Sequence, residues 1–180
     1  IVGPVGCGKT SFLLSLLGES HSVSGHESSA RVWRGRHRAF CGQRPIVINA
    51  TVGENILFGA TQTARRDVYE ESLRAACLEA DLASLSMGDS TEVGERGVGL
   101  SGGQKARVSI ARAVYSQADT LIFDDPLSAL DAEVGHRVFD ELILKELSGK
   151  TRLLVTNQLW CLERCDRVVV LGEDQRIAQQ

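Results

Sequence analysis

The sequence lacks any apolar stretch approaching the roughly 20 residues that a helix needs to span a bilayer. It also lacks the charged and then apolar pattern of a secretory signal peptide. We therefore expect no membrane-spanning or targeting segment within these 180 residues. The length is enough for one domain of moderate size, so we predict a single domain over 1–180.

Paired cysteines and a large net charge are also missing. The five cysteines contain no CxxC pair, so the spacing typical of a zinc site is absent and reduced thiols in an intracellular compartment are expected. The net charge is only −3, and nothing global points to a nucleic-acid partner.

Short apolar runs alternate with helical patterns along the chain. Helical spacing or end signals predict helices over 9–17, 66–85, 104–115 and from Asp131 to about Gly149. Apolar or β-branched runs predict strands over 30–34, 38–43, 120–124, 151–157 and 167–171, the last three buried, and Gly- and Ser-rich loops are predicted over 19–30 and 88–99. This alternation predicts an α/β fold with a mainly parallel sheet flanked by helices.

The segment "GPVGCGKT" fits the phosphate-loop pattern G-x-x-x-x-G-K-[ST]. Glycines let the backbone turn its N–H groups toward phosphate oxygens, and the following helix presents its N-terminus to the same anion. Lys9 is placed to reach the β- and γ-phosphates, and the Thr10 hydroxyl to ligate Mg²⁺. The predicted ATP-binding residues of this loop are Gly3, Pro4, Val5, Gly6, Cys7, Gly8, Lys9, Thr10 and Ser11.

Only Ile1 and Val2 precede this loop, although a phosphate loop normally follows a strand. The chain also does not begin with Met. We expect it to be a fragment of a longer polypeptide.

The run "TLIFDD" places two carboxylates at the end of a predicted buried strand. Open α/β sheets bind ligands at the carboxyl ends of their strands, so Asp124 is expected to hold Mg²⁺ through water. Asp125 follows directly and is a candidate for the catalytic base.

The segment "LSGGQ" is a second candidate anion site, separate from the first. Ser101 can cap the helix that follows, while Gly102 and Gly103 leave its first N–H groups bare. Gln104 ends this segment.

The order of the motifs resembles that of the nucleotide-binding domain of ABC transporters. In chain order these motifs are the phosphate loop, Gln43, LSGGQ, the Asp124 strand, the "SALD" loop (128–131) and Asn157. Stretches such as "NATVGENILFG" and "LLVTNQL" resemble subfamily C, the multidrug-resistance-associated group, and in particular its first nucleotide-binding domain. The resemblance covers essentially the whole chain. It implies a P-loop NTPase whose helical subdomain, at about 55–115, carries LSGGQ, and whose first strands and adenine-stacking aromatic lie before residue 1.

The resemblance also implies roles and partners. Gln43 would complete the Mg²⁺ shell and sense the γ-phosphate of ATP. The segment from Gln43 to about Glu54 would face the coupling helices of a transmembrane domain, at the cytosolic face of a membrane. LSGGQ would close over ATP held by a second nucleotide-binding domain.

Two positions depart from the family's hydrolytic pattern. The base is usually Glu, whereas this chain has Asp125, and the switch residue is usually His, whereas this chain has Asn157. Both departures occur in first domains of subfamily C, so we expect a degenerate ATP site with weak hydrolysis. Two alternatives to a transporter remain open at this point: a regulatory domain that gates a channel, and a soluble ABC ATPase without transport.

Overall fold

A parallel sheet forms the centre of the fold in the computed structural model, which describes residues 1–19, 37–60, 65–95, 99–174 and 176–179. Its strands are β1 (Arg38–Cys41), β4 (Thr120–Asp124) and β5 (Thr151–Val155), in the order β1-β4-β5. The central strand β4 is buried over its last four residues, as the unbroken apolar run predicts. The α/β fold with a parallel sheet is thus confirmed.

The first two residues extend this sheet beside β5. The Ile1 nitrogen donates to the Leu154 carbonyl at 2.7 Å, and Thr156 N–H donates to the Ile1 carbonyl at 3.1 Å. Val2 pairs in parallel with Val170 of β6 (Val170–Leu171), which itself pairs antiparallel with β7 (Ile177–Gln179). The phosphate loop therefore leaves the carboxyl end of a sheet segment, as its motif requires.

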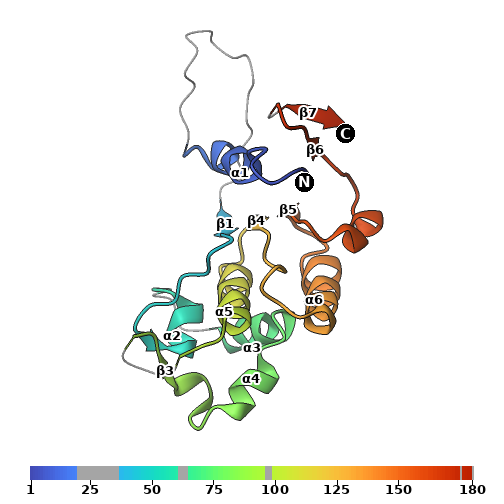
Figure 1. Cartoon of the computed structure of the whole chain (residues 1–180). Coiled ribbons are helices and arrows are strands. Elements are labelled where there is room, and N and C mark those ends of the chain that lie inside the picture. Colours follow the sequence, from blue (N-terminus) through green and yellow to red (C-terminus); the bar gives the residue numbers. More distant parts are fainter. Residues whose placement is uncertain (20–36, 61–64, 96–98, 175, 180) are drawn as a thin grey trace.

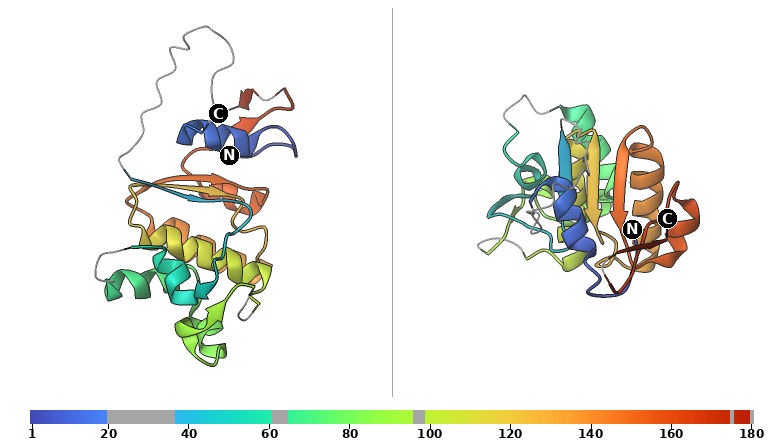
Figure 2. Two further views of the ribbon diagram at one scale, coloured as in Figure 1. Left: turned by 90° about the vertical axis from the view of Figure 1, so that its left-hand side faces the viewer. Right: turned by 90° about the horizontal axis from the view of Figure 1, so that it is seen from above.

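Helices cover both faces of the sheet (Figures 1 and 2). On one face, α1 (Lys9–Leu17) packs Leu13 against Ile122 and Val155. On the other lie α5 (Gly102–Tyr115) and α6 (Ala132–Val138), which continues as a π-helix over Phe139–Glu146. The larger core lies on this second face and contains Phe123, Val138, Phe139 and Leu142, all fully buried.

Short helices and a small sheet pack on the side of α5 that faces away from the main sheet (Figure 1). The helices are α2 (Val52–Leu57), α3 (Arg66–Ala75), α4 (Glu79–Ser84) and a 3₁₀ turn over Gly88–Ser90. β2 (Ala50–Thr51) and β3 (Glu92–Val93) form the small antiparallel sheet. That these elements form a distinct subdomain over about 55–115 stays a prediction.

Several elements differ from the sequence-based expectation. The helix predicted over 66–85 is two helices, because Cys77 adopts a left-handed φ of 53° and Leu78 N–H bonds back to the Leu73 carbonyl at 3.0 Å, which ends α3. The predicted loop at 88–99 contains β3, since pairing with β2 supplies hydrogen bonds that its own residues do not signal.

Both C-terminal strands were predicted to be buried, and this was wrong for most of their length. Arg152, Leu153 and Leu154 of β5 are only partly buried, because short segments flank that side of the sheet. Of the predicted 167–171 strand, Val170–Leu171 forms β6, and a 3₁₀ helix over Leu159–Arg164 precedes it. The strand predicted at 30–34, and the loop predicted at 19–30 beyond Glu19, lie outside the described residues.

The helix that follows the SALD loop begins as predicted. The Asp131 carboxylate accepts a hydrogen bond from Val134 N–H at 2.9 Å, and Val138 and Leu142 are fully buried.

Within the described part of the chain, no helix is long and apolar enough to cross a membrane.

We predict that Asp131→Ala lowers the free energy of unfolding by about 1 kcal/mol, because it removes the side-chain cap of α6. Asp131→Asn keeps an equivalent acceptor and should stay within a few tenths of a kcal/mol of the parent. Urea unfolding followed by circular dichroism measures both. Equal destabilisation by the two variants would show that the charge, and not the cap, matters.

Candidate phosphate-binding and signature-motif sites

The loop before α1 folds around the Lys9 side chain. Gly6 and Gly8 take left-handed φ values of 85° and 90°, which glycine adopts without strain. The Lys9 ammonium donates to the Gly3 carbonyl at 2.7 Å and to the Pro4 carbonyl at 2.9 Å. Because an ammonium has three N–H donors, one remains for an incoming phosphate oxygen.

The base of this loop is tightly packed. A Cβ atom at Gly3 would lie 2.5 Å from the Leu171 carbonyl oxygen and 2.8 Å from the Cys7 sulfur, so only glycine fits there. Cys7 is itself buried. Gly3, Pro4 and Cys7 do not line the cavity that the rest of the loop borders.

The two predicted magnesium ligands meet at the carboxyl end of β4. The Thr10 hydroxyl donates to Asp124 Oδ2 at 2.6 Å, across 114 residues of sequence, and Asp124 is 3% exposed. A hydroxyl and a carboxylate side by side suit a hard cation that prefers oxygen ligands, so these residues fit Mg²⁺.

A cavity of about 320 Å³ opens over this pair. It brings together most of the residues predicted from the sequence, including the exposed Gln43 side chain. Its lining residues are Val5, Gly6, Gly8, Lys9, Thr10, Ser11, Gln43, Asp124, Asp125, Val155 and Asn157.

Hydrogen bonds constrain both the backbone and the carboxylate of Asp125. Its backbone takes a left-handed φ of 51°, and its N–H donates to the Val155 carbonyl at 2.9 Å. The Asn157 amide nitrogen donates to Asp125 Oδ2 at 3.0 Å, while Asp125 Oδ1 is buried without a hydrogen-bond partner. The base candidate and the switch candidate are therefore in direct contact.

The LSGGQ segment begins α5 with a reciprocal capping box. The Ser101 hydroxyl accepts from Gln104 N–H at 3.2 Å, and Gln104 Oε1 accepts from Ser101 N–H at 2.9 Å. A Cβ at Gly102 would meet no atom within 4 Å, so the surface over this turn is open. None of Ser101–Gln104 lines the phosphate-loop cavity, which agrees with two separate sites.

One residue at each site carries no functional signal in the sequence. Val155 lines the cavity and orients Asp125 through its carbonyl, but an apolar residue at a strand end gives no chemical signal. Asp81 of α4 contacts Gln104 and Arg107 and belongs to no motif. Only the tertiary contact reveals it.

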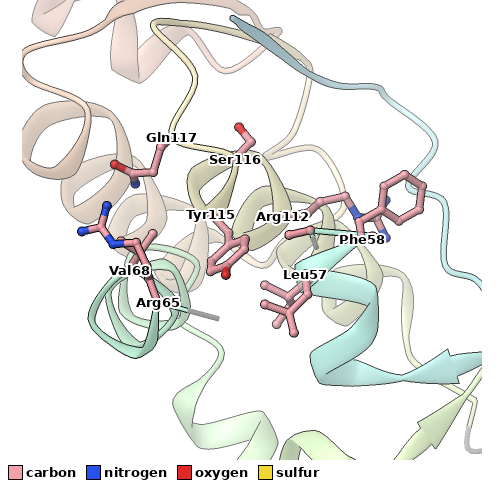
Figure 3. Close-up of a pocket in the computed structure, with 11 residues that line it drawn as sticks. Leu57, Phe58, Arg65, Val68, Arg112, Tyr115, Ser116 and Gln117 are labelled. Atoms are coloured by element: carbon pink, nitrogen blue, oxygen red, sulfur yellow. The ribbon is translucent and has the colours of Figure 1, made fainter. Parts of the chain in front are cut away.

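A further hollow of about 550 Å³ lies between α2, α3 and α5 (Figure 3). Leu57, Val68 and Tyr115 give it an apolar wall. The Arg112 guanidinium lies 4.3 Å from the centre of the half-exposed Phe58 ring, and it donates to the Asn55 carbonyl at 2.7 Å. Burial lowers the pKa of Arg112, yet an arginine stays charged at neutral pH.

All five cysteines are free thiols. Burial raises the pKa of Cys41, Cys161 and Cys165, so these thiols stay protonated at neutral pH. Among the described residues there is no group of three or more His, Cys, Asp or Glu side chains that could hold a metal ion by themselves.

Comparison with known proteins agrees with this geometry. Residues 1–128 match the family described as ABC transporter. The chain is 46% identical over 177 residues to human ATP-binding cassette sub-family C member 3. This match covers 97% of this chain and 11% of that protein. It is 44% identical over 177 residues to the oligomycin resistance ATP-dependent permease YOR1 of Saccharomyces cerevisiae, covering 98% and 11%.

Human ATP-binding cassette sub-family C member 10 is 46% identical over 173 residues, covering 95% of this chain and 11% of that protein. The chain thus spans about 11% of the length of these curated relatives. It belongs to the ABC transporter family and is an ATP-binding domain related to the subfamily C transporters.

Proposed function

We propose that this domain works within a membrane transporter, at the cytosolic face, where ATP binding and hydrolysis between two nucleotide-binding domains drive a substrate across the membrane. In this proposal the domain is the first of the two, and its own ATP site hydrolyses slowly. The observation that carries the proposal is the Asp125–Asn157 contact beside an otherwise complete phosphate site.

Binding groups for MgATP are present in the cavity. Lys9 keeps a free donor for the β- and γ-phosphates, and the N-terminus of α1 adds its partial positive charge. Thr10 and Asp124 would hold Mg²⁺ from one side, with Gln43 completing its shell from the rim. When bound, the ion would neutralise charge on the β- and γ-phosphate oxygens.

The groups that would act on the attacking water are weaker. Asp has an intrinsic acidity close to that of Glu, but its side chain is one methylene shorter, so it loses reach and not basicity. One of its oxygens already accepts the Asn157 amide. That amide cannot take up or release a proton near neutral pH as an imidazole can. Slow turnover at this site follows from both deficits.

Partners are proposed from the two exposed regions. The open turn at Ser101–Gln104 would close over ATP on a second nucleotide-binding domain, in the same chain or in a partner subunit. The segment from Gln43 to Glu54 would meet the transmembrane coupling helices. Ile46 and Ile48 in that segment are 67% and 43% exposed, which suits burial against a partner.

Transport is favoured over the two alternatives. The relatives include proteins named a permease and, in Leishmania tarentolae, a multidrug resistance protein. No feature of the described residues favours channel gating or a soluble ATPase over this proposal.

Lys9→Ala in the full-length protein should weaken MgATP binding to this domain by about 1.5–3 kcal/mol, roughly 10- to 150-fold in Kd, because a charge-assisted contact is lost. Photolabelling of this domain with an azido-nucleotide measures the effect. Arg44→Ala, an exposed neighbour outside the cavity lining, is the control and should label like the parent. Undiminished labelling of Lys9→Ala would remove the assignment of this loop.

Gly102→Asp should abolish steady-state ATPase activity of the full protein while labelling of this domain's own phosphate loop survives. The introduced carboxylate would stand where a γ-phosphate oxygen docks, and like charges repel. Gly102→Asn has the same size without the charge and should retain more activity. Normal ATPase activity in Gly102→Asp would contradict a role for LSGGQ at the partner's ATP.

Asp125→Asn should leave steady-state ATPase activity of the full protein nearly unchanged, because hydrolysis is centred on the partner's phosphate loop. Asp125→Glu combined with Asn157→His should raise turnover at this site, by up to about 10²-fold if reach is the deficit. Turnover is measured with the partner's phosphate loop inactivated. A large loss in Asp125→Asn, with ATP labelling preserved, would show that Asp125 is a working base.

A further inference from the structure

The Gln104 side chain spans two partners that require opposite ends of its amide. Its oxygen accepts from Ser101 N–H at 2.9 Å, which closes the capping box of α5. Its nitrogen donates to Asp81 Oδ1 on α4 at 3.1 Å. Reversing the amide would break both hydrogen bonds, because it would set a donor against a donor and an acceptor against an acceptor.

Asp81 is itself firmly placed. The Arg107 guanidinium donates to its two oxygens at 2.8 and 2.7 Å. The Arg107 side chain is only 11% exposed and the Asp81 side chain only 18%. A carboxylate can only accept hydrogen bonds, so it selects the NH₂ end of the neighbouring amide. The charge-assisted hydrogen bonds from Arg107 hold the carboxylate in position.

We propose that Asp81 is a positioning residue for the LSGGQ motif. By selecting the orientation of the Gln104 amide, it keeps the Gln104 oxygen on Ser101 N–H and the capping box closed. The first turn of α5 is then held with Gly102 exposed and with open space around it. This inference rests on the proposed function, because it matters for catalysis only if LSGGQ contacts the partner's ATP.

A fixed orientation of the Gln104 amide has a consequence that a simple ion pair between Asp81 and Arg107 does not have. Asp81→Asn introduces a group that can donate or accept, so Gln104 is no longer forced into one orientation. Gln104→Glu places a second carboxylate beside Asp81, and the two like charges repel. The double variant again has one carboxylate, which can only accept hydrogen bonds, and one amide. The two groups have exchanged places between positions 81 and 104. The introduced glutamate then accepts both from Ser101 N–H and from the introduced amide.

The test uses the full-length protein in membranes and measures ATPase activity, photolabelling of this domain's phosphate loop and the thermal unfolding midpoint. We expect each single variant to lower ATPase activity about tenfold, within the ~10²-fold that a ~1 Å misplacement can cost. The double variant should return to within about threefold of the parent. Labelling should be unchanged throughout, because the phosphate-loop cavity does not include these residues.

A double variant as impaired as the product of the two single effects would overturn the proposal, as would a parental rate in both single variants. If Asp81→Asn fails to fold, the comparison of Gln104→Glu with the double variant still decides, since the proposal requires the second change to rescue the first. The Gly102→Asp variant distinguishes failure of the proposed function of LSGGQ from failure of the proposed role of Asp81. Normal ATPase activity there removes the role of LSGGQ and this inference with it, whereas loss of activity without rescue in the double variant removes this inference alone.

Discussion

The hydrogen bond between the Thr10 hydroxyl and Asp124 holds the phosphate site together. It joins the start of α1 to the end of β4, and both its atoms are candidate magnesium ligands. The contact needs the phosphate loop to leave the sheet next to β5, which the Ile1 and Val2 hydrogen bonds provide. It also needs β4 at the sheet centre, where flanking strands exclude water. The site therefore depends on the order of the strands as much as on the motif.

The same strand order explains why Asp125 and Asn157 meet. β4 and β5 are parallel neighbours, with Asp124 opposite Val155, so the residues that follow each strand emerge side by side. The left-handed backbone at Asp125 turns its carboxylate toward Asn157 and into the cavity. A carboxylate that already accepts an amide, with its other oxygen buried and unpaired, is a constrained group. This constraint gives the proposed slow turnover a structural cause beyond the short reach of an aspartate.

The signature motif is organised by a different kind of contact. Its capping box is local, between residues three apart, whereas the carboxylate that orients it comes from α4, 23 residues before Gln104. Asp81, Gln104 and Arg107 join α4 to the start of α5. The phosphate site and the signature site thus share one domain but draw their order from different elements.

The sequence by itself determined the elements with strong local signals. The start of α1 at Lys9, the buried β4, the cap at Asp131 and the start of α5 at LSGGQ depend on residues within a few positions of each other, and each lies where the sequence predicts it. The tertiary structure alone decided the break at Cys77, the β2–β3 pairing, the partial exposure of β5, and the contacts that Val155 makes with Asp125 and Asp81 with Gln104. These depend on contacts between distant segments, whose free energy outweighs local preference and leaves no periodic pattern in the chain.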